Sequence, residues 1–430
     1  MRILIICQYF PPEPHRLMGE LASTLASFGH EVTVLTGFPH WPAGKLYPGY
    51  RMRLYVREET GGITVFRMPL YPDHSASALK RALNLASFVG SACLIAPWVV
   101  PRPDVVYVIS PPPLVIPAWL FGFVWGVPLT YEVQDMWPEA LVGAGMAPGG
   151  AVLALVGALA KRAFATAAAI RVISPGFRRD LISRGVPQER IRVISNWVDA
   201  EVERSAPEPG AAVPDCPELA GKFVVMFTGN IGLAQGLEVV LDAAELLRDA
   251  PNVVFVLAGD GVELPRLERL RRERGIDNVV FIGRRRPEEM PALMSRADVL
   301  LVHLRDKPGL RTCIPHKTLS YLASGKPVLA AVRGDTADLI LREGAGVTCE
   351  PENAADMARA VRLLRSMPAC KLARFGQNGR AAARERYSRE LLVREVETML
   401  VATARDHPHR RTRRARKKPA DARSYSRQVD

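Results

Sequence analysis

The first 37 residues alternate between apolar runs and a helical repeat of apolar positions. From Arg2 to Cys7 the chain reads as an apolar run, which is typical of a parallel strand covered on both faces. From Leu17 to Phe28, apolar residues recur at three- and four-residue spacing, and Gly29 follows before the β-rich run "EVTVLTG". The pattern predicts a strand, a helix and a second strand, joined by a right-handed crossover.

The loop after the first strand, "QYFPPEPHR", lacks the glycines of a dinucleotide-binding loop. Pro11, Pro12 and Pro14 stand there instead, and proline has no backbone N–H to donate to a phosphate. We therefore do not expect this loop to cradle a pyrophosphate, although the surrounding pattern is that of a nucleotide-binding α/β domain.

The same pattern begins again in the second half of the chain. Short β-rich runs alternate with helix-length segments up to residue 195, and a Pro-, Ala- and Glu-rich stretch follows. After it, "FVVMFTGNIGLAQGLEVVLDAAELL" repeats the strand, loop and helix pattern. We predict an α/β protein with Rossmann-like domains at 1–204 and 223–387, a linker at 205–222 and a returning helix at 388–404.

Composition agrees with this organisation. A chain of 430 residues exceeds one ordinary core, and a hydrophobic content of 48% excludes a disordered chain. The six cysteines show no Cys-x-x-Cys spacing, so neither a zinc site nor a disulfide framework is indicated. The N-terminus lacks the pattern of a secretory signal peptide, so we expect a protein of the reducing cytoplasm.

The positive charge is concentrated at the C-terminus. The net charge is +13, and residues 405–430 carry ten Lys/Arg against three Asp, which is +7 (10 − 3). We expect this segment to be a disordered basic tail, either simply solvated or in contact with an anionic membrane surface. Nucleic acid is not an expected partner, because no recognition motif accompanies the basic residues.

No segment contains an uninterrupted apolar run of membrane-spanning length. Residues 83–100 come closest, but Asn84, Ser87, Ser91 and Pro97 interrupt the run. We expect a core helix there, and the alternative is a helix lying in a membrane interface. The expected location is the cytoplasm, with a peripheral position on the inner face of the cell membrane as a possibility that the basic tail raises.

Two segments of the second half suggest an anion site. The loop "TGNIGLAQG" places Gly229, Gly232 and Gly236 before a helix, where the backbone can approach a phosphate closely. In "IPHKTLSYLASGKPV", Pro315 and Lys317 fall at the start of a second helix. A lysine near a positive helix end is disfavoured unless both share an anion, although a lysine directed into solvent would give the same pattern.

These motifs, taken in order, resemble those of the GT-B glycosyltransferases. The relevant segments are "VQDMWPE", "VISNWVD", "FTGNIGLAQGLE", "GDG" and "IPHKTLSYLASGKPV". More narrowly, they are similar to retaining family 4 enzymes of the colanic-acid and O-antigen type, from residue 1 to about residue 400. The resemblance implies two Rossmann-like domains facing a central cleft.

The resemblance also implies the reaction. A sugar passes with retention from a nucleotide-diphosphate donor to a lipid-linked or polysaccharide acceptor in cell-envelope or exopolysaccharide biosynthesis. The second domain would hold the donor, expected to be a UDP-sugar rather than a GDP-sugar, and the first would receive the acceptor. No cofactor and no metal are expected.

Several positions depart from the family's pattern. Asn230 and Gln235 stand in the second-domain loop where Arg and Lys are usual, and Thr312 and Ser320 stand where paired glutamates are usual. Ser320 can still hydrogen-bond a ribose hydroxyl, more weakly than a carboxylate. The double glycine of many first loops is replaced by Pro14 and His15.

Sugar transfer without a metal needs positive charge and oriented N–H groups at the leaving diphosphate. We assign this role to Lys317 and the loop around Asn230 and Gly232, with Arg311 and Arg16 as further cations. Asp135 is the best carboxylate to contact the transferred sugar or the acceptor, with Glu139 behind it, although Asp135 also suits a helix N-cap. The expected catalytic residues are thus Asp135, Lys317 and Glu139, and the expected donor-binding residues are Gly229, Asn230, Gly232, Gln235, Arg311, Pro315 and Ser320.

Two alternatives fit the same sequence. A nucleotide-sugar epimerase of GT-B fold would share the donor site, and sugar transferred to an acceptor with release of free UDP would exclude it. A non-catalytic, membrane-docked partner of a polysaccharide machine would fit the missing glutamates, and it would bind no nucleotide diphosphate.

We expect transferase activity to survive chelation, because Lys317 and a helix N-terminus can replace a divalent cation at the diphosphate. Turnover measured with and without EDTA should agree. A loss of turnover in EDTA that Mg²⁺ or Mn²⁺ restores would contradict this expectation.

Overall fold

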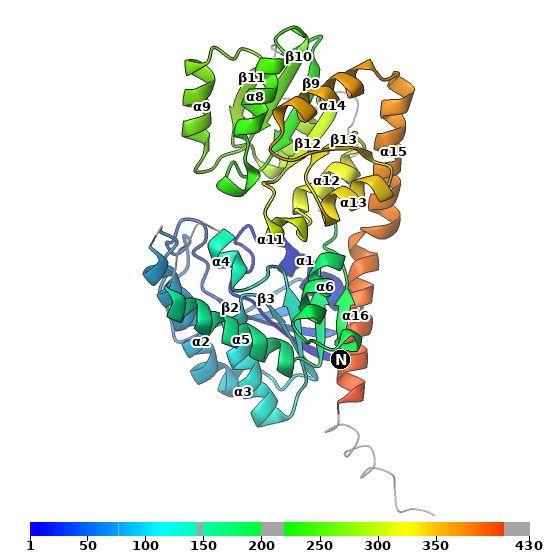
Figure 1. Cartoon of the computed structure of the whole chain (residues 1–430). Coiled ribbons are helices and arrows are strands. Elements are labelled where there is room, and N and C mark those ends of the chain that lie inside the picture. Colours follow the sequence, from blue (N-terminus) through cyan, green and yellow to red (C-terminus); the bar gives the residue numbers. More distant parts are fainter. Residues whose placement is uncertain (76, 144–148, 199–218, 408–430) are drawn as a thin grey trace, which may run out of the picture. The chain divides into compact units, whose positions relative to one another are not determined.

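The computed structural model describes residues 1–75, 77–143, 149–198 and 219–407. Residues 205–218 of the predicted linker and 408–430 of the predicted basic tail lie outside these ranges. The described chain forms helices and strands in alternation along its length (Figure 1).

The first half of the chain contributes an eight-stranded sheet with the order β3-β4-β2-β1-β5-β6-β7-β8. β1 pairs in parallel with both β2 and β5, whereas β3 and β4 form an antiparallel hairpin. The strand order reverses between β1 and β5, so the loop after β1 lies where ligands bind in open α/β sheets. The strands are β1 (Arg2–Ile6), β2 (Glu31–Gly37), β3 (Val56–Thr60), β4 (Ile63–Met68), β5 (Val105–Ile109), β6 (Leu129–Val133), β7 (Ala169–Val172) and β8 (Ile191–Val193).

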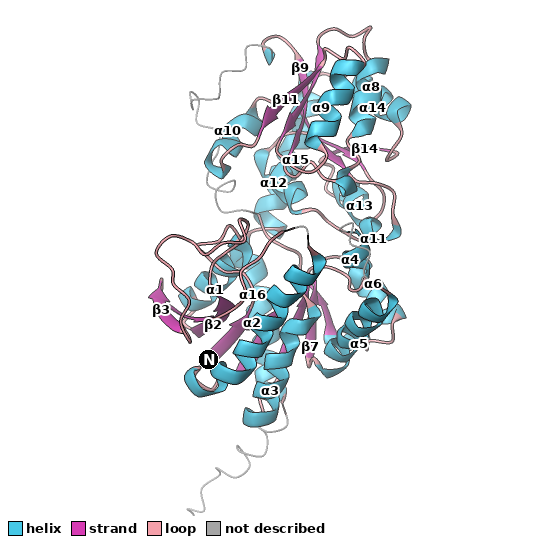
Figure 2. Cartoon of the chain, turned by 90° about the vertical axis from the view of Figure 1, so that its left-hand side faces the viewer, coloured by secondary structure: helices cyan, strands magenta, loops and turns pink. Residues whose placement is uncertain are grey.

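Helices connect these strands (Figure 2). The predicted first helix is present, and Gly29, with φ +86°, follows its end as expected of a C-terminal glycine. The α-helices of this half are α1 (Arg16–Ser27), α2 (Ala78–Val99), α3 (Val115–Trp125), α4 (Glu139–Gly143), α5 (Gly150–Thr166) and α6 (Pro175–Ser183).

The second half forms a six-stranded sheet with the order β11-β10-β9-β12-β13-β14, and every adjacent pair is parallel. Its strand order reverses between β9 and β12. The strands are β9 (Phe223–Thr228), β10 (Val253–Ala258), β11 (Val279–Gly283), β12 (Val299–His303), β13 (Val328–Ala331) and β14 (Gly346–Cys349). The helices are α8 (Glu238–Leu246), α9 (Leu264–Glu273), α10 (Met290–Ser295), α11 (Pro308–Arg311), α12 (His316–Ser324), α13 (Asp335–Arg342), α14 (Ala354–Ser366), α15 (Ala369–Arg386) and α16 (Arg389–Asp406).

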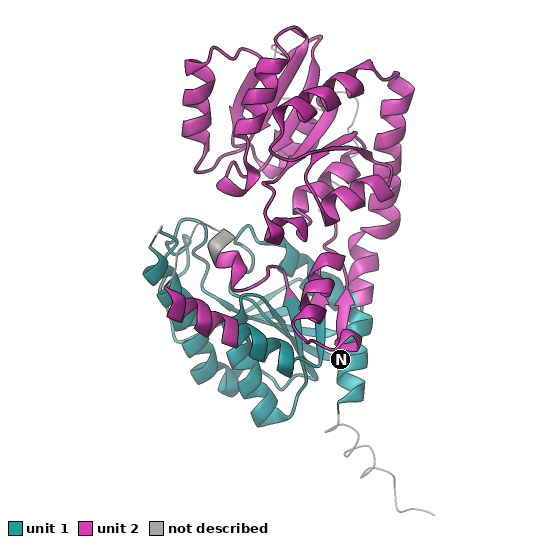
Figure 3. Cartoon of the chain, viewed as in Figure 1, with its two compact units in different colours: residues 1–132, 159–170, 396–430 teal, residues 133–158, 171–395 magenta. Residues whose placement is uncertain are grey.

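By internal contacts the chain divides into two compact units (Figure 3). Unit 1 comprises Met1–Glu132, Leu159–Ile170 and Val396–Asp430, and unit 2 comprises Val133–Ala158 and Arg171–Glu395. Within unit 1, Glu397 of α16 lies 2.7 Å from His30, which follows α1. The last part of the predicted returning helix thus groups with the first strands of the chain.

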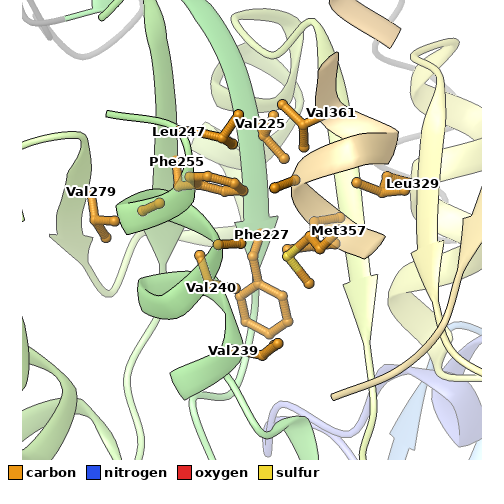
Figure 4. Close-up of a cluster of buried hydrophobic side chains, with 14 of the residues drawn as sticks. Val225, Phe227, Val239, Val240, Leu247, Phe255, Val279, Leu329, Met357 and Val361 are labelled. Atoms are coloured by element: carbon orange, nitrogen blue, oxygen red, sulfur yellow. The ribbon is translucent and has the colours of Figure 1, made fainter. Parts of the chain in front are cut away.

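The core of the second sheet is continuous and almost entirely aliphatic and aromatic (Figure 4). All six residues of β10 are buried, as expected of a central parallel strand covered on both faces. Phe255 of β10 is fully buried among Val225, Leu247 and Val279 of the same cluster.

Replacing Phe255 with Ala should leave a cavity that the surrounding strands cannot close. We expect the free energy of unfolding of this part to fall by about 3–5 kcal/mol, measured by urea denaturation. The matched control is Leu246→Ala on α8, because Leu246 is 49% exposed and its loss should cost less than about 1 kcal/mol. Equal losses in the two variants would contradict this account of the core.

Candidate donor site

The candidate site lies at the carboxyl ends of β9 and β12, where the order of the second sheet reverses. The loop after β9, residues 229–236, carries the predicted glycines and is called the donor loop. The segment after β12 leads through α11 into α12, which contains Lys317. Ligands of open α/β sheets bind at such a position. The residues that form this candidate site belong to unit 2.

The glycines after β9 allow two loops to lie against each other. The backbone N–H of Gly229 donates to Ala258 O, and that of Ile231 donates to Asp260 O, both at 2.8 Å. Gly259 has φ +155°, and a Cβ there would lie 1.8 Å from Gly229 O. The "GDG" motif is thus required by backbone contact with the donor loop, in addition to any ligand contact.

Gln235 holds the donor loop from within. Its side-chain oxygen accepts the N–H of Gly232 at 3.2 Å, so that N–H is already engaged. Asn230, in contrast, is exposed, and its side-chain amide lies beside Gly232. Of the two residues that replace the usual cations, Gln235 orders the loop and Asn230 remains accessible.

Arg305 fixes the loop to its surroundings. Its guanidinium donates to Leu233 O at 2.8 Å, to Glu352 at 2.8 Å and also to Glu238 at the start of α8. These contacts lower the pKa of Glu238 against the opposing effect of burial. The sequence analysis did not identify Arg305, because its role depends on partners 47 to 72 residues away.

His303, at the end of β12, completes this framework. Its Nδ1 donates to Gln235 O, and its Nε2 accepts the N–H of Glu352 at 3.0 Å. The second contact requires a neutral ring, and burial lowers the pKa of His303 accordingly. The ring therefore stays in one tautomer and ties the donor loop to the segment after β14.

Lys317, in the first turn of α12, directs its ammonium group toward the donor loop. Its Nζ lies 3.6 Å from the centre of the Phe227 ring, and a Cβ at Gly229 would lie 3.3 Å from it. Nζ is buried and has no hydrogen-bond partner within the described residues. Burial lowers the pKa of Lys317 to about 7.

A buried ammonium group without an anion is unfavourable, and the aromatic ring compensates only part of the lost hydration. The backbone N–H groups of the first turn of α12 carry partial positive charge at the same place. The arrangement has the electrostatics of an anion site that an incoming diphosphate would neutralise.

The other predicted residues in and before α12 have surroundings that differ from those of Lys317. Pro315 is the N-cap of α12, directly before its first turn, and Gly325 ends the helix with φ +73°. Ser320 is buried, at 9% exposure, and lies one residue before Tyr321, whose hydroxyl accepts the Thr228 N–H at 2.8 Å. Thr312 accepts, through its carbonyl oxygen, a hydrogen bond from Ser174 at 2.6 Å.

Arg311 is engaged by a carboxylate. Its guanidinium donates twice to Asp306, at 2.7 and 3.0 Å, and this contact lowers the pKa of Asp306. Lys317 has no such partner in the part of the chain that the structure describes, so the two cations differ in their availability to an anion. Arg16, the other expected cation, begins α1 in unit 1.

Asp135 and Glu139 follow β6. Asp135 is exposed to solvent as a residue, yet desolvation by the surrounding atoms raises the pKa of its carboxyl group. Burial raises the pKa of the Cys313 thiol, and the nearby Asp135 carboxylate raises it further. Cys313 precedes α12 by three residues. Glu139 instead pairs with Arg184 of unit 2 at 2.9 Å, on the surface.

The loop without glycine, after β1 in unit 1, is organised by a buried carboxylate. Glu13 accepts the backbone N–H groups of Phe10, His40 and Trp41 at 2.9 to 3.1 Å. Five rings gather beside it, with centroid separations of 4.7 to 6.1 Å: Tyr9, His15, His40, Trp41 and His74. Glu13 was not identified from the sequence, although a lone acid among three prolines was a possible signal.

Comparison with known proteins identifies the family of this chain. Residues 14–197 match the Glycosyl transferase 4-like domain, and residues 217–382 match Glycosyl transferases group 1. The putative colanic acid biosynthesis glycosyl transferase WcaI of Escherichia coli (strain K12) is 31% identical over 391 residues, which cover 86% of this chain and 93% of that protein. The chain belongs to the family 4 type of GT-B glycosyltransferases.

Further similarities agree with this family. The probable glycosyltransferase WbjE of Pseudomonas aeruginosa is 27% identical over 247 residues, 56% of this chain and 60% of that protein. HepE of Anabaena, solved in complex with UDP, superposes with a TM-score of 0.67 at 18% identity, covering 94% of this chain and 100% of that one. The family resemblance and the GT-B fold predicted for this glycosyltransferase from its sequence are confirmed.

The buried Lys317 should lower the stability of the ligand-free glycosyltransferase. Its pKa is lowered from 10.5 to about 7 in the folded state, so the unfolded chain binds more protons between these values and stability rises with pH. We expect Lys317→Met to raise the free energy of unfolding by about 1–4 kcal/mol below pH 7, and by progressively less toward pH 10. Denaturation curves across this range test the effect, with the exposed Lys307→Met as control. A uniform loss of stability in Lys317→Met would contradict the unpaired buried charge.

Proposed function

We propose that this glycosyltransferase moves a sugar from a UDP-sugar onto a lipid-linked or polysaccharide acceptor, with retention, in cell-envelope or exopolysaccharide biosynthesis. The observation that carries the proposal is the buried, unpartnered Lys317 amine beside Gly229. The named role of WcaI in colanic acid biosynthesis and the UDP bound in HepE support the pathway and the nucleotide.

In this proposal the donor diphosphate contacts Lys317 and the first turn of α12. Gly229 and Asn230 present the exposed part of the loop to the same ligand, while Gly232 and Gln235 hold its shape. Pro315 directs the chain into α12, and Ser320 contributes a hydroxyl toward the ribose. Arg311 is a secondary cation, since binding the donor would require it to leave Asp306.

During transfer, the bond between the anomeric carbon and the donor phosphate oxygen breaks, and its electron pair stays on the diphosphate. The acceptor hydroxyl oxygen bonds to that carbon on the same face, and its proton passes to the departing phosphate oxygen. Lys317 and the α12 N–H groups stabilise the growing negative charge, which is how this site would lower the barrier. No metal and no cofactor take part in this scheme.

We assign Asp135 to the transferred sugar or the acceptor hydroxyl. Its raised pKa and its position near Cys313 place a polar group beside the segment that leads into α12. Glu139 has a supporting role, because its pairing with Arg184 would position the segment that carries Asp135. Asp135→Asn should therefore lower turnover more than Glu139→Gln.

We further propose that the rings beside Glu13 receive the acceptor glycan. Sugars stack on aromatic faces through their C–H groups, and Trp41 and His15 lie 4.7 Å apart in a loop that Glu13 holds in place. A lipid-linked acceptor would bring the protein to the inner face of the cell membrane as a peripheral protein of the cytoplasm.

Three measurements test the proposed reaction. Calorimetry with UDP and GDP identifies the nucleotide, and release of UDP that depends on acceptor separates transfer from epimerisation. The anomeric configuration of the product, determined by NMR, tests retention. Absence of binding to either nucleotide would contradict the donor site, whereas an inverted product would contradict only the stereochemistry.

Lys317→Ala should lose far more turnover than Ser320→Ala. A contact that strengthens as the diphosphate leaves contributes about 2–4 kcal/mol to the barrier, so turnover should fall tens- to a thousandfold. Ser320 would contact a ribose that does not change charge, so its loss should raise the apparent KM by about tenfold with kcat nearly unchanged. Near-normal turnover of Lys317→Ala in a UDP-release assay would remove Lys317 from the site.

A further inference from the structure

Helix α2 carries an arginine, Arg81, on the side that it turns toward unit 1. At 100° per residue, Arg81 falls within the arc of the residues that α2 buries, which are Asn84, Phe88, Val89, Ala92 and Ala96. Leu94 and Trp98 fall outside this arc and are 75% and 87% exposed. Arg81 therefore leaves the helix on its buried side, although a charged side chain is usually found on the other.

The next turn of α2 shows what this side contacts. Asn84 accepts the side-chain N–H of Gln8 at 2.5 Å, and its own amide donates to His40 Nε2 at 2.9 Å. Gln8 lies in the loop after β1 and His40 in the loop after β2, the two loops that Glu13 holds together. Residues three apart on a helix are neighbours, so Arg81 lies over the same loops.

The Arg81 guanidinium lacks a partner. Its Nε is buried and has no hydrogen-bond partner within the described residues. Asp73, the acid that precedes α2, accepts the backbone N–H and the hydroxyl of Ser75 at 2.9 and 2.8 Å instead. Glu13 is engaged by three backbone N–H groups. A desolvated cation near the positive end of a helix is unfavourable unless it meets an anion.

The charge of Arg81 acts on two rings of the cluster beside Glu13. Burial raises the pKa of Tyr9 to about 12, and Arg81 opposes this effect. Desolvation lowers the pKa of His74, and Arg81 lowers it further. Because the interaction of charges weakens with distance, both effects place the guanidinium near these rings.

The rings beside Arg81 are ordered and accessible. Tyr9 stacks on His15, with ring centroids 5.0 Å apart and an interplanar angle of 12°. The indole N–H of Trp41 donates to His74 Nε2 at 3.2 Å, which fixes the orientation of both rings. Tyr9 and Trp41 are half-buried, whereas His15 and His74 are exposed. A sugar could therefore reach these rings from solvent and lie beside the guanidinium.

The charges of the cluster match a ligand with one negative charge. Desolvation lowers the pKa of both His15 and His74, so both rings are neutral at pH 7 and Arg81 supplies the positive charge. The Glu13 carboxylate is close enough to raise the pKa of Tyr9 beyond the effect of burial, and it would repel a phosphate dianion. A carboxylate carries a single charge and matches the planar guanidinium of Arg81.

We propose that Arg81 binds the carboxylate of a uronic acid in the acceptor glycan, while the sugar ring stacks on Trp41 and Tyr9. The inference rests on the proposed acceptor site and names the class of sugar that it receives. The carboxylate oxygens accept hydrogen bonds from the guanidinium, including its Nε–H. A neutral hexose leaves the guanidinium unpaired, so Arg81 discriminates between acidic and neutral sugars.

The test measures the binding of small probes beside Trp41 in the full-length protein. The chain is labelled with fluorotryptophan, and fluorine NMR follows the Trp41 resonance, which the Trp41→Phe variant identifies. Methyl glucuronide, methyl glucoside and glucose phosphate are titrated with UDP in excess, so that the donor site is not available to them. Arg81→Gln and Arg81→Lys are compared with Lys80→Gln, which removes an exposed positive charge from the adjacent position.

We expect methyl glucuronide to bind the unaltered chain and Lys80→Gln about ten- to a hundredfold more tightly than methyl glucoside, because only the acid pairs with the guanidinium. Arg81→Gln should remove this preference without changing the affinity for the glucoside. Arg81→Lys should retain part of it, because lysine keeps the charge but not the planar geometry. Circular dichroism and UDP affinity should be unchanged in all variants.

Four results would overturn the proposal. They are no shift of the Trp41 resonance with glucuronide, equal affinity for glucuronide and glucoside, a preference for glucuronide that persists in Arg81→Gln, and tighter binding of glucose phosphate than of glucuronide. The last result would assign Arg81 to a phosphate. Failure of the proposed transfer reaction would be seen separately, as absent UDP binding or absent acceptor-dependent release of UDP, and it would leave the discrimination between the two sugars intact.

Discussion

The unpaired ammonium group of Lys317 is the constraint that explains the arrangement of the donor loop. A buried charge is tolerated here because Phe227 offers its ring face and because the glycine at 229 leaves room for Nζ. Acids of the neighbouring loops are paired with other cations: Glu238 and Glu352 with Arg305, and Asp306 with Arg311. Within the described residues the Lys317 amine has no such partner, so it is available to a ligand.

Much of the fold could be predicted from the sequence because its signals are local. Apolar runs identified strands such as β1 and β9, and Gly29 identified the end of the first helix. Lys317 was found in the same way, from its place in a first helical turn. The order of motifs along the chain then sufficed to name the family and the GT-B fold.

What the sequence did not reveal depends on long-range contacts. Examples are the pairing of Arg311 with Asp306, the three backbone N–H groups that Glu13 accepts, and the hydrogen bonds of Arg305. Such contacts can be predicted only when it is known which loops lie next to each other. The expectation of a core helix at 83–100 was correct for only one side of α2. Periodicity cannot distinguish two apolar faces of one helix, because both appear as hydrophobic positions.

The fixed tautomer of His303 has a consequence for acid sensitivity. A proton added to Nε2 would confront the N–H of Glu352 and remove the link between the donor loop and the segment after β14. Because the pKa of His303 is lowered in the folded state, the unfolded chain takes up this proton more readily as the pH falls below about 6.5. Acid would therefore loosen the donor loop before it affects the apolar core beneath it.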